Sequence, residues 1–211
     1  MVLLIRRPTL FGIKKKVQTY PKAMAIFGSS TKDIAVKCRA TVFKTGAILA
    51  KHNVRLVYGV GDDGMMGASY QGVRSEKGKV LGITLPLLLK RQCADPKIYK
   101  KGELKLVDNL DERKYLMLKN ADALLIAPGG WGTLDEIATY AVHFKIGDWP
   151  AVPIIFLNYR HYWDGFLKFV KQMEKDGAVT AKQIAFIGSV KKPKNIFKEY
   201  RHILKQIEKS K

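Results

Sequence analysis

The chain is poor in the residues that build disulfide frameworks and metal sites. Among its 211 residues are two cysteines, Cys38 and Cys93, which form no CxxC pair, and four scattered histidines. Thiolate zinc sites need clustered ligands, and unpaired cysteines are typical of a reducing compartment. No apolar run approaches the ~20 residues that a membrane-spanning helix needs. We therefore expect a cytoplasmic protein with no metal site and no membrane partner.

Acidic residues are also scarce, with 18 Asp and Glu against 38 Lys and Arg, so the formal net charge is +20. Much of the excess lies at the two ends: residues 1–22 contain six basic residues and no acid, and residues 189–211 contain eight basic and two acidic residues. Charge at chain ends is typical of solvated tails or general anion attraction, with nucleic-acid binding as the alternative. Because no recognised nucleic-acid motif accompanies the charge, specific nucleic-acid binding is not expected.

The chain does contain a regular alternation of short apolar runs with longer helical patterns. The runs, which predict strands, are residues 23–28, 54–59, 79–86, 104–107, 122–128, 152–158 and 184–189. The helical patterns are residues 31–52, 108–120, 134–146, 161–176 and 193–209. Most runs are continuously apolar, as in strands that helices cover on both faces. This predicts an α/β fold, a doubly wound, Rossmann-like parallel sheet in one domain of residues 23–211 behind a basic arm of residues 1–22.

Glycine-rich junctions follow three of the predicted strands, and each leads into a helix. They are "FGSS" (27–30), "YGVGDDGMMG" (58–67) and "PGGWGT" (128–133). Glycine lets a ligand approach the backbone closely, and a helix N-terminus adds free N–H groups and partial positive charge. Ligands of such sheets bind beyond the carboxyl ends of the strands, so the three junctions predict a site for a nucleotide-like anion. The GxxxxGK[ST] motif is absent, and "GVGDDG" lacks the acidic residue of a dinucleotide fingerprint about 20 residues on.

The charged residues near the third junction have two interpretations. Thr133 and Glu136 have the spacing of a capping box, in which each side chain binds the backbone N–H of the other residue. Arg113 and Lys114 could likewise belong to a solvated helix face and pair locally with acidic neighbours. The alternative is a catalytic site, because a carboxylate beside an anion-binding loop can stabilise an oxocarbenium-like state or activate water.

The combined motifs make the chain resemble the Lonely guy family of cytokinin-activating phosphoribohydrolases, whose members are often labelled lysine decarboxylases. "PGGWGTLDE" matches the family signature PGGxGTxxE in full, and "ERKYLM" matches ERKxxM. "YGVGDDGMMG" is similar to YGGGxxGLMG, and "FLNYRHYWDGFLKFV" is similar to a further family segment. The resemblance extends from about residue 23 to about residue 180.

The resemblance implies hydrolysis of the N-glycosidic bond of a nucleoside 5′-monophosphate, either AMP or N6-modified AMP, to free base and ribose 5-phosphate. It assigns catalysis to Arg113 and Glu136, implies no metal or organic cofactor, and implies a homodimer or higher homo-oligomer. The substrate-binding residues that it implies are Gly28, Ser29, Gly61, Gly64, Met66, Gly67, Lys114, Gly129, Gly130, Trp131, Gly132 and Thr133.

Several residues depart from the family pattern, with Met65 and Asp135 as mild changes and three others near the predicted site. Val60 replaces the middle glycine of the second junction, and Trp131 stands where tyrosine is common. Trp131 either packs locally or forms a wall of the base pocket. Thr139 replaces a carboxylate that we expect on the pocket side of the helix. The departures leave AMP as plausible a substrate as a cytokinin precursor, and they keep open the alternative of a nucleotide-binding or carrier protein without turnover.

Overall fold

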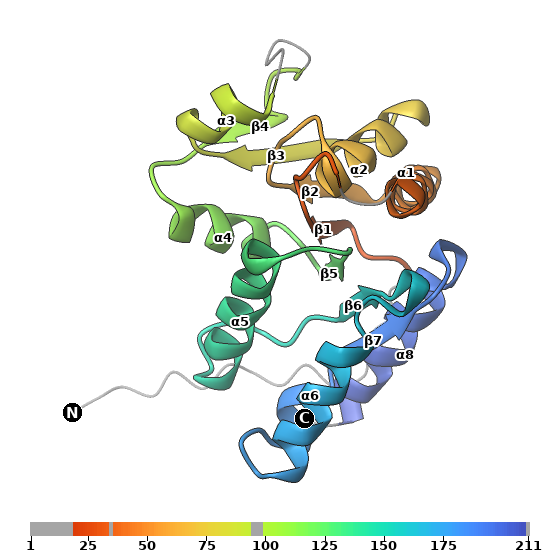
Figure 1. Cartoon of the computed structure of the whole chain (residues 1–211), viewed down its shortest axis with the longest axis vertical. Helices are drawn as coiled ribbons and strands as arrows, with labels where there is room; N and C mark the ends of the chain where they lie inside the picture. The colour runs from red at the N-terminus through yellow and green to blue at the C-terminus, as the bar shows by residue number, and fades with distance from the viewer. Residues whose placement is uncertain (1–18, 34–35, 94–98, 210–211) are drawn as a thin grey trace, which may run out of the picture.

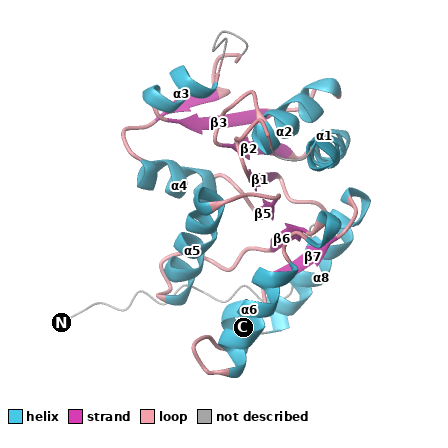
Figure 2. Ribbon diagram, viewed as in Figure 1, coloured by secondary structure: helices cyan, strands magenta, loops and turns pink. Residues whose placement is uncertain are grey.

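A parallel sheet of seven strands organises the part of the chain that the structure, a computed structural model, describes: residues 19–33, 36–93 and 99–209. The strand order is β4-β3-β2-β1-β5-β6-β7, and every neighbouring pair is parallel (Figure 2). The predicted strands are thereby confirmed: β1 (Ala23–Phe27), β2 (Arg55–Tyr58), β3 (Val80–Thr84), β4 (Leu104–Leu106), β5 (Ala123–Ile126), β6 (Ile154–Leu157) and β7 (Ile187–Val190).

Helices cover both faces of this sheet (Figure 1). One face carries α1 (Val36–Lys51), α2 (Gly64–Ser75) and α8 (Ile196–Lys209), and the other carries α4 (Leu110–Lys119) and α5 (Trp131–Lys145). Every residue of β1 and β5 is buried as a result, which explains their continuous apolar sequence. The fold is therefore the predicted doubly wound, Rossmann-like sheet. No helix in the described ranges combines the length and the apolar character that crossing a membrane requires.

The remaining helices lie in the connections: α3 (Pro86–Gln92) between β3 and β4, and α6 (Asp164–Lys175) and α7 (Ala181–Ile184) between β6 and β7. The last predicted strand begins three residues too early, because residues 181–184 are helical. Thr180 and Gln183 form a capping box: the Thr180 hydroxyl accepts the Gln183 N–H at 3.3 Å, and the Gln183 side chain accepts the Thr180 N–H at 2.8 Å.

The strand order changes direction between β1 and β5. From β1 the chain builds outward through β2, β3 and β4, and it then returns to place β5 on the other side of β1. Pairing continues just beyond both strands, because the Ala127 N–H donates to Phe27 O at 2.8 Å and the Ser29 N–H donates to Pro128 O at 3.1 Å. The first and third glycine junctions thus lie side by side where doubly wound sheets bind ligands.

Most of the predicted basic arm, residues 1–18, lies outside the described residues. Its last residues contact the domain. The ring of Tyr20 stacks on His52 with a centroid distance of 4.5 Å and meets Phe197 edge-on at 4.8 Å. The Lys22 N–H donates to the Asp122 carboxylate at 2.8 Å.

Candidate active site

A cavity of about 240 Å³ lies at the carboxyl ends of β1 and β5. A larger hollow of about 520 Å³ lies at the far end of α5, but no carboxylate or histidine lines it. The smaller cavity contains both charged residues that the sequence singles out as catalytic. Its lining residues are Gly28, Ser29, Ser30, Thr31, Met66, Leu88, Gln92, Arg113, Gly130, Trp131, Gly132, Thr133 and Glu136.

One wall of the cavity is the N-terminus of α5. Gly130 is the N-cap residue and has no side chain to cap the helix, and its carbonyl accepts the Leu134 N–H at 3.0 Å. Within the described residues, no acceptor is recorded for the backbone N–H groups of Trp131, Gly132 and Thr133. A Cβ atom added at Gly130 or Gly132 would meet nothing within 4 Å, so both backbones are open to a ligand. Free amides and the positive end of the helix dipole together suit a phosphate group.

The capping box expected between Thr133 and Glu136 is not formed. The helix begins three residues earlier than that arrangement requires, at Trp131 instead of Leu134, so Thr133 lies inside the first turn. The Thr133 hydroxyl instead packs against Gly129, where an added Cβ would lie 2.1 Å from Thr133 Oγ1. The capping interpretation of Glu136 is therefore wrong.

Arg113 reaches the cavity from α4 and is anchored to the ends of two strands. Asn109 caps α4 by accepting the Glu112 N–H at 2.8 Å, which places Arg113 in the first turn. The guanidinium donates from Nε to Ile83 O at 3.2 Å and from Nη2 to Gly59 O at 3.0 Å. Arg113 is only 9% exposed, so the solvated-face alternative does not hold for it. Burial lowers its pKa and the charge of Glu136 raises it, but a guanidinium stays charged in proteins.

Glu136 is the only carboxylate among the lining residues of the cavity. Burial raises its pKa to about 8, against the charges of Arg113 and Lys114, which lower it, while Asp135 adds to the rise. No ion pair closer than 4 Å joins Glu136 to a base within the described residues. The carboxyl group is therefore mostly protonated at neutral pH in the free protein. A pKa this close to neutrality is typical of a general acid or base.

A family model described as possible lysine decarboxylase matches residues 66–200. The chain belongs to this family. Because its curated relatives have LOG names, we call it the LOG family. Cytokinin riboside 5'-monophosphate phosphoribohydrolase LOG1 of Arabidopsis thaliana is 27% identical over 194 residues, which cover 92% of this chain and 89% of the relative. The probable phosphoribohydrolase LOGL9 of Oryza sativa subsp. japonica is 30% identical over 158 residues, which cover 75% of this chain and 68% of the relative.

Among solved structures, the molybdenum cofactor carrier protein of Chlamydomonas reinhardtii has a similar fold. The match has a TM-score of 0.62 at 17% identity and covers 87% of this chain and 98% of the carrier. At this identity the similarity establishes the fold alone. The LOG-family chain thus shares its architecture with proteins whose names describe a carrier rather than an enzyme.

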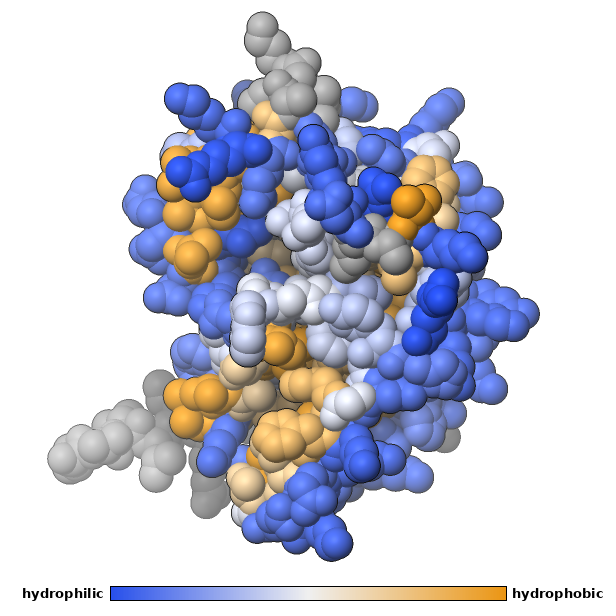
Figure 3. All heavy atoms as spheres, viewed as in Figure 1, coloured by the Kyte–Doolittle hydropathy of each residue, from blue (hydrophilic) through white to orange (hydrophobic). Residues whose placement is uncertain are grey.

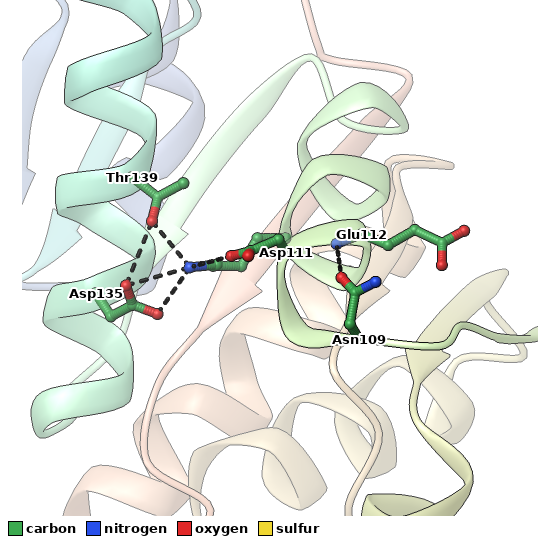
Figure 4. A network of polar contacts seen from close by, with 6 residues as sticks. Asn109, Asp111, Glu112, Asp135 and Thr139 are labelled. Carbon is green, nitrogen blue, oxygen red and sulfur yellow. Dashed lines mark hydrogen bonds and ion pairs between the residues drawn. The ribbon is translucent and has the colours of Figure 1, made fainter.

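Lys114, which the resemblance places in the substrate site, is not among the residues that line the cavity. Its amine lies 3.1 Å from Asp111, 3.1 Å from Asp135 and 3.1 Å from Thr139 (Figure 4). Burial lowers its pKa, but these carboxylates outweigh burial and raise it. Thr139 was expected on the pocket side of the helix, and that expectation is wrong, because its hydroxyl faces Lys114 and Asp135. The departure from the family pattern at Thr139 therefore lies outside the cavity.

Four glycines that were predicted to bind substrate do not line the cavity: Gly61, Gly64, Gly67 and Gly129. At Gly64 the backbone has φ +61°, and an added Cβ would lie 2.3 Å from Ser29 O, so only glycine fits. Gly129 accepts the Tyr162 hydroxyl at 2.8 Å through its carbonyl oxygen. The predicted residues that do line the cavity are Gly28, Ser29, Met66, Arg113, Gly130, Trp131, Gly132, Thr133 and Glu136.

Four cavity-lining residues were not predicted: Ser30, Thr31, Leu88 and Gln92. Leu88 and Gln92 belong to α3, a seven-residue helix that is not among the predicted elements. The sequence feature that indicates this helix is Pro86, since proline is favoured in the first turn of a helix. Trp131 is 88% exposed at the cavity rim, so the alternative that it packs locally is wrong.

Proposed function

We propose that this LOG-family protein hydrolyses the N-glycosidic bond of a nucleoside 5′-monophosphate, AMP or an N6-modified AMP, to free base and ribose 5-phosphate. The observation that carries the proposal is a single partly buried carboxyl group with a raised pKa, Glu136, in the same cavity as the open amides of α5. The names of the curated relatives support it, since both describe phosphoribohydrolases of cytokinin riboside 5′-monophosphates.

In this proposal the 5′-phosphate binds at the N-terminus of α5. The amides of Gly132 and Thr133 have no partner in the described structure, and the open Gly130 backbone lets the phosphate approach. Arg113 adds a fixed positive charge on the other side of the cavity. A phosphate held at this wall places the attached ribose in the cavity that Glu136 lines.

Glu136 then acts first as an acid and next as a base. The C1′–N bond breaks with its electron pair going to the base, and protonated Glu136 donates its proton to that base. The resulting carboxylate, stabilised by Arg113, stabilises the oxocarbenium ion. It then accepts a proton from the water that attacks C1′, which restores the starting form. Since the free protein must hold this proton, kcat/KM is expected to fall as the pH rises through about 8.

The family description as a lysine decarboxylase does not fit the residues of the cavity. Amino-acid decarboxylation normally needs an electron sink such as pyridoxal phosphate, which is held as a Schiff base by a lysine. None of the lining residues is a lysine, and the amine of Lys114 is held by Asp111, Asp135 and Thr139. We derive no step through that cofactor.

A second candidate is nucleotide binding or carriage without turnover, which the similarity to a carrier fold favours. The discriminating experiment is incubation with AMP and isopentenyl-AMP, followed by chromatography for free base and ribose 5-phosphate. The hydrolase proposal predicts equal amounts of both products. Measurable binding to a panel of nucleoside monophosphates without release of base would instead support the carrier.

A further inference from the structure

Gln92 contributes a polar atom to the cavity that the structure leaves unsatisfied. Its Oε1 is buried and has no hydrogen-bond partner among the residues that the structure describes. Buried polar atoms are almost always hydrogen-bonded, because an unpaired buried acceptor destabilises the folded state. An exception that faces a ligand cavity is explained if the ligand supplies the missing donor.

The surroundings of this oxygen form an apolar corner. A Cβ atom built at Gly61 would lie 3.5 Å from Met66 Cε and 3.7 Å from Gln92 Oε1, so Gly61 lies beside both side chains. Leu88 lies one helical turn before Gln92 and lines the same cavity. The backbone of Gln92 is held in place, because its carbonyl accepts the Asp62 N–H at 2.8 Å. Apolar side chains around one unpaired acceptor suit a flat base that has one N–H group to donate.

We propose that Gln92 reads the base by accepting a hydrogen bond from the exocyclic 6-amino group of a purine. The inference rests on the proposed function. Adenine and singly N6-substituted adenines both keep an N–H at this position. With the Gln92 amide oriented as in the structure, a 6-oxo purine would set a second acceptor against Gln92 Oε1, so hypoxanthine is disfavoured. Gln92 is therefore a specificity-determining residue that separates AMP from IMP.

The test compares AMP with IMP, which differ only in the 6-amino and 6-oxo groups and the attached ring proton, in wild type and in Gln92→Met. Methionine keeps the length of the side chain and removes the acceptor. The preference for AMP over IMP, in affinity and in kcat/KM, should fall by about 10-fold or more, mainly through weaker AMP recognition. The melting temperature of the ligand-free variant should be unchanged or raised, because an unpaired buried oxygen is removed. Leu88→Met, in the same cavity, serves as the control and should retain the AMP preference.

Two results would overturn the role of Gln92. If Gln92→Met weakens the affinities for AMP and for IMP by the same factor, Gln92 contacts the ribose rather than the base. If Gln92→Met lowers the melting temperature, the role of Gln92 is structural. Failure of the proposed hydrolysis is recognised separately. If the wild type binds nucleotides but releases no base, the equilibrium affinities for AMP and IMP still test Gln92.

Discussion

Glu136 is a carboxyl group in surroundings that oppose its charge. Burial raises its pKa from an ordinary value of 4.5 to about 8. In the unfolded chain the group loses its proton near the ordinary value, whereas the folded protein holds it until about pH 8. The folded state therefore loses stability relative to the unfolded state as the pH rises between these two values. The group that we assign to catalysis thus destabilises the fold at neutral pH.

Replacement of Glu136 by glutamine should remove this destabilisation. Above pH 8, Glu136→Gln should raise the melting temperature by at least ~2–4 °C, which corresponds to about 1 kcal/mol for a protein of this size. At pH 4 the variant and wild type should unfold at similar temperatures, because both side chains are then uncharged. Exposed Glu208 supplies the control, and Glu208→Gln should show no such pH-dependent gain. Equal stability of Glu136→Gln and wild type at both pH values would contradict the raised pKa.

The position of the Arg113 guanidinium depends on the absence of a side chain at Gly59. A Cβ atom at position 59 would lie 1.7 Å from Arg113 Nη2, so Gly59→Ala must displace the guanidinium. We expect kcat/KM for AMP to fall by about 10-fold or more, since small displacements of catalytic groups are costly. Gly165→Ala is the matched control, because no atom lies within 4 Å of a Cβ there. Near-native activity of Gly59→Ala would show that the position of Arg113 is unimportant.

At the scale of elements, the second glycine junction and β3 compensate for each other. Val60 has φ +66° and is fully buried, a conformation that β-branched residues rarely adopt. Its side chain fits because β3 has a glycine opposite: a Cβ at Gly82 would lie 2.6 Å from Val60 Cγ2. The departure from the family glycine at Val60 is thus accommodated by Gly82.

A double-mutant cycle measures this coupling. Gly82→Ala alone should destabilise the protein by about 1–3 kcal/mol through overpacking. In the background of Val60→Gly, Gly82→Ala should lower the free energy of unfolding by a smaller amount. Chemical denaturation should give a coupling energy of at least ~1 kcal/mol between the two substitutions. Additive effects of the two substitutions would show that Val60 and Gly82 do not compensate for each other.

The elements were predictable from sequence to the extent that they are buried on both faces. β1 and β5 are continuously apolar because helices cover both sides, and the glycine junctions marked the ends of their strands. The role of α3 was not predictable, because Gln92 approaches Met66 only through tertiary packing. The capping-box expectation for Thr133 failed because spacing alone does not determine where α5 begins.

At the scale of the whole molecule, α5 and its C-cap residue carry an apolar stripe that the described residues leave exposed. Ile137 and Tyr140 face the core, while Trp131, Val142 and Ile146 are 88%, 56% and 68% exposed. The three exposed residues lie on one side of the helix by its periodicity. Figure 3 shows apolar surface near the end of α5. We propose that a second copy of the chain covers this stripe, which gives a homodimer.

Val142→Lys should therefore shift the protein toward monomer in light scattering, because a charge would be buried in the interface. The matched control is Phe169→Lys, which changes an equally exposed apolar residue on α6 and should leave assembly unchanged. A wild-type protein that is monomeric at every concentration would contradict the dimer.

The central claim is that Glu136 carries out the chemistry, and the most direct measurement is the kcat of Glu136→Gln for AMP. Glutamine can neither donate the proton nor become the carboxylate. We expect kcat to fall at least ~100-fold, equivalent to about 2.7 kcal/mol of barrier. KM should change little, because the phosphate contacts at Gly132 and Thr133 remain. If Glu136→Gln instead hydrolyses AMP within about 3-fold of the wild-type rate, Glu136 is not the catalytic acid and the mechanism is wrong.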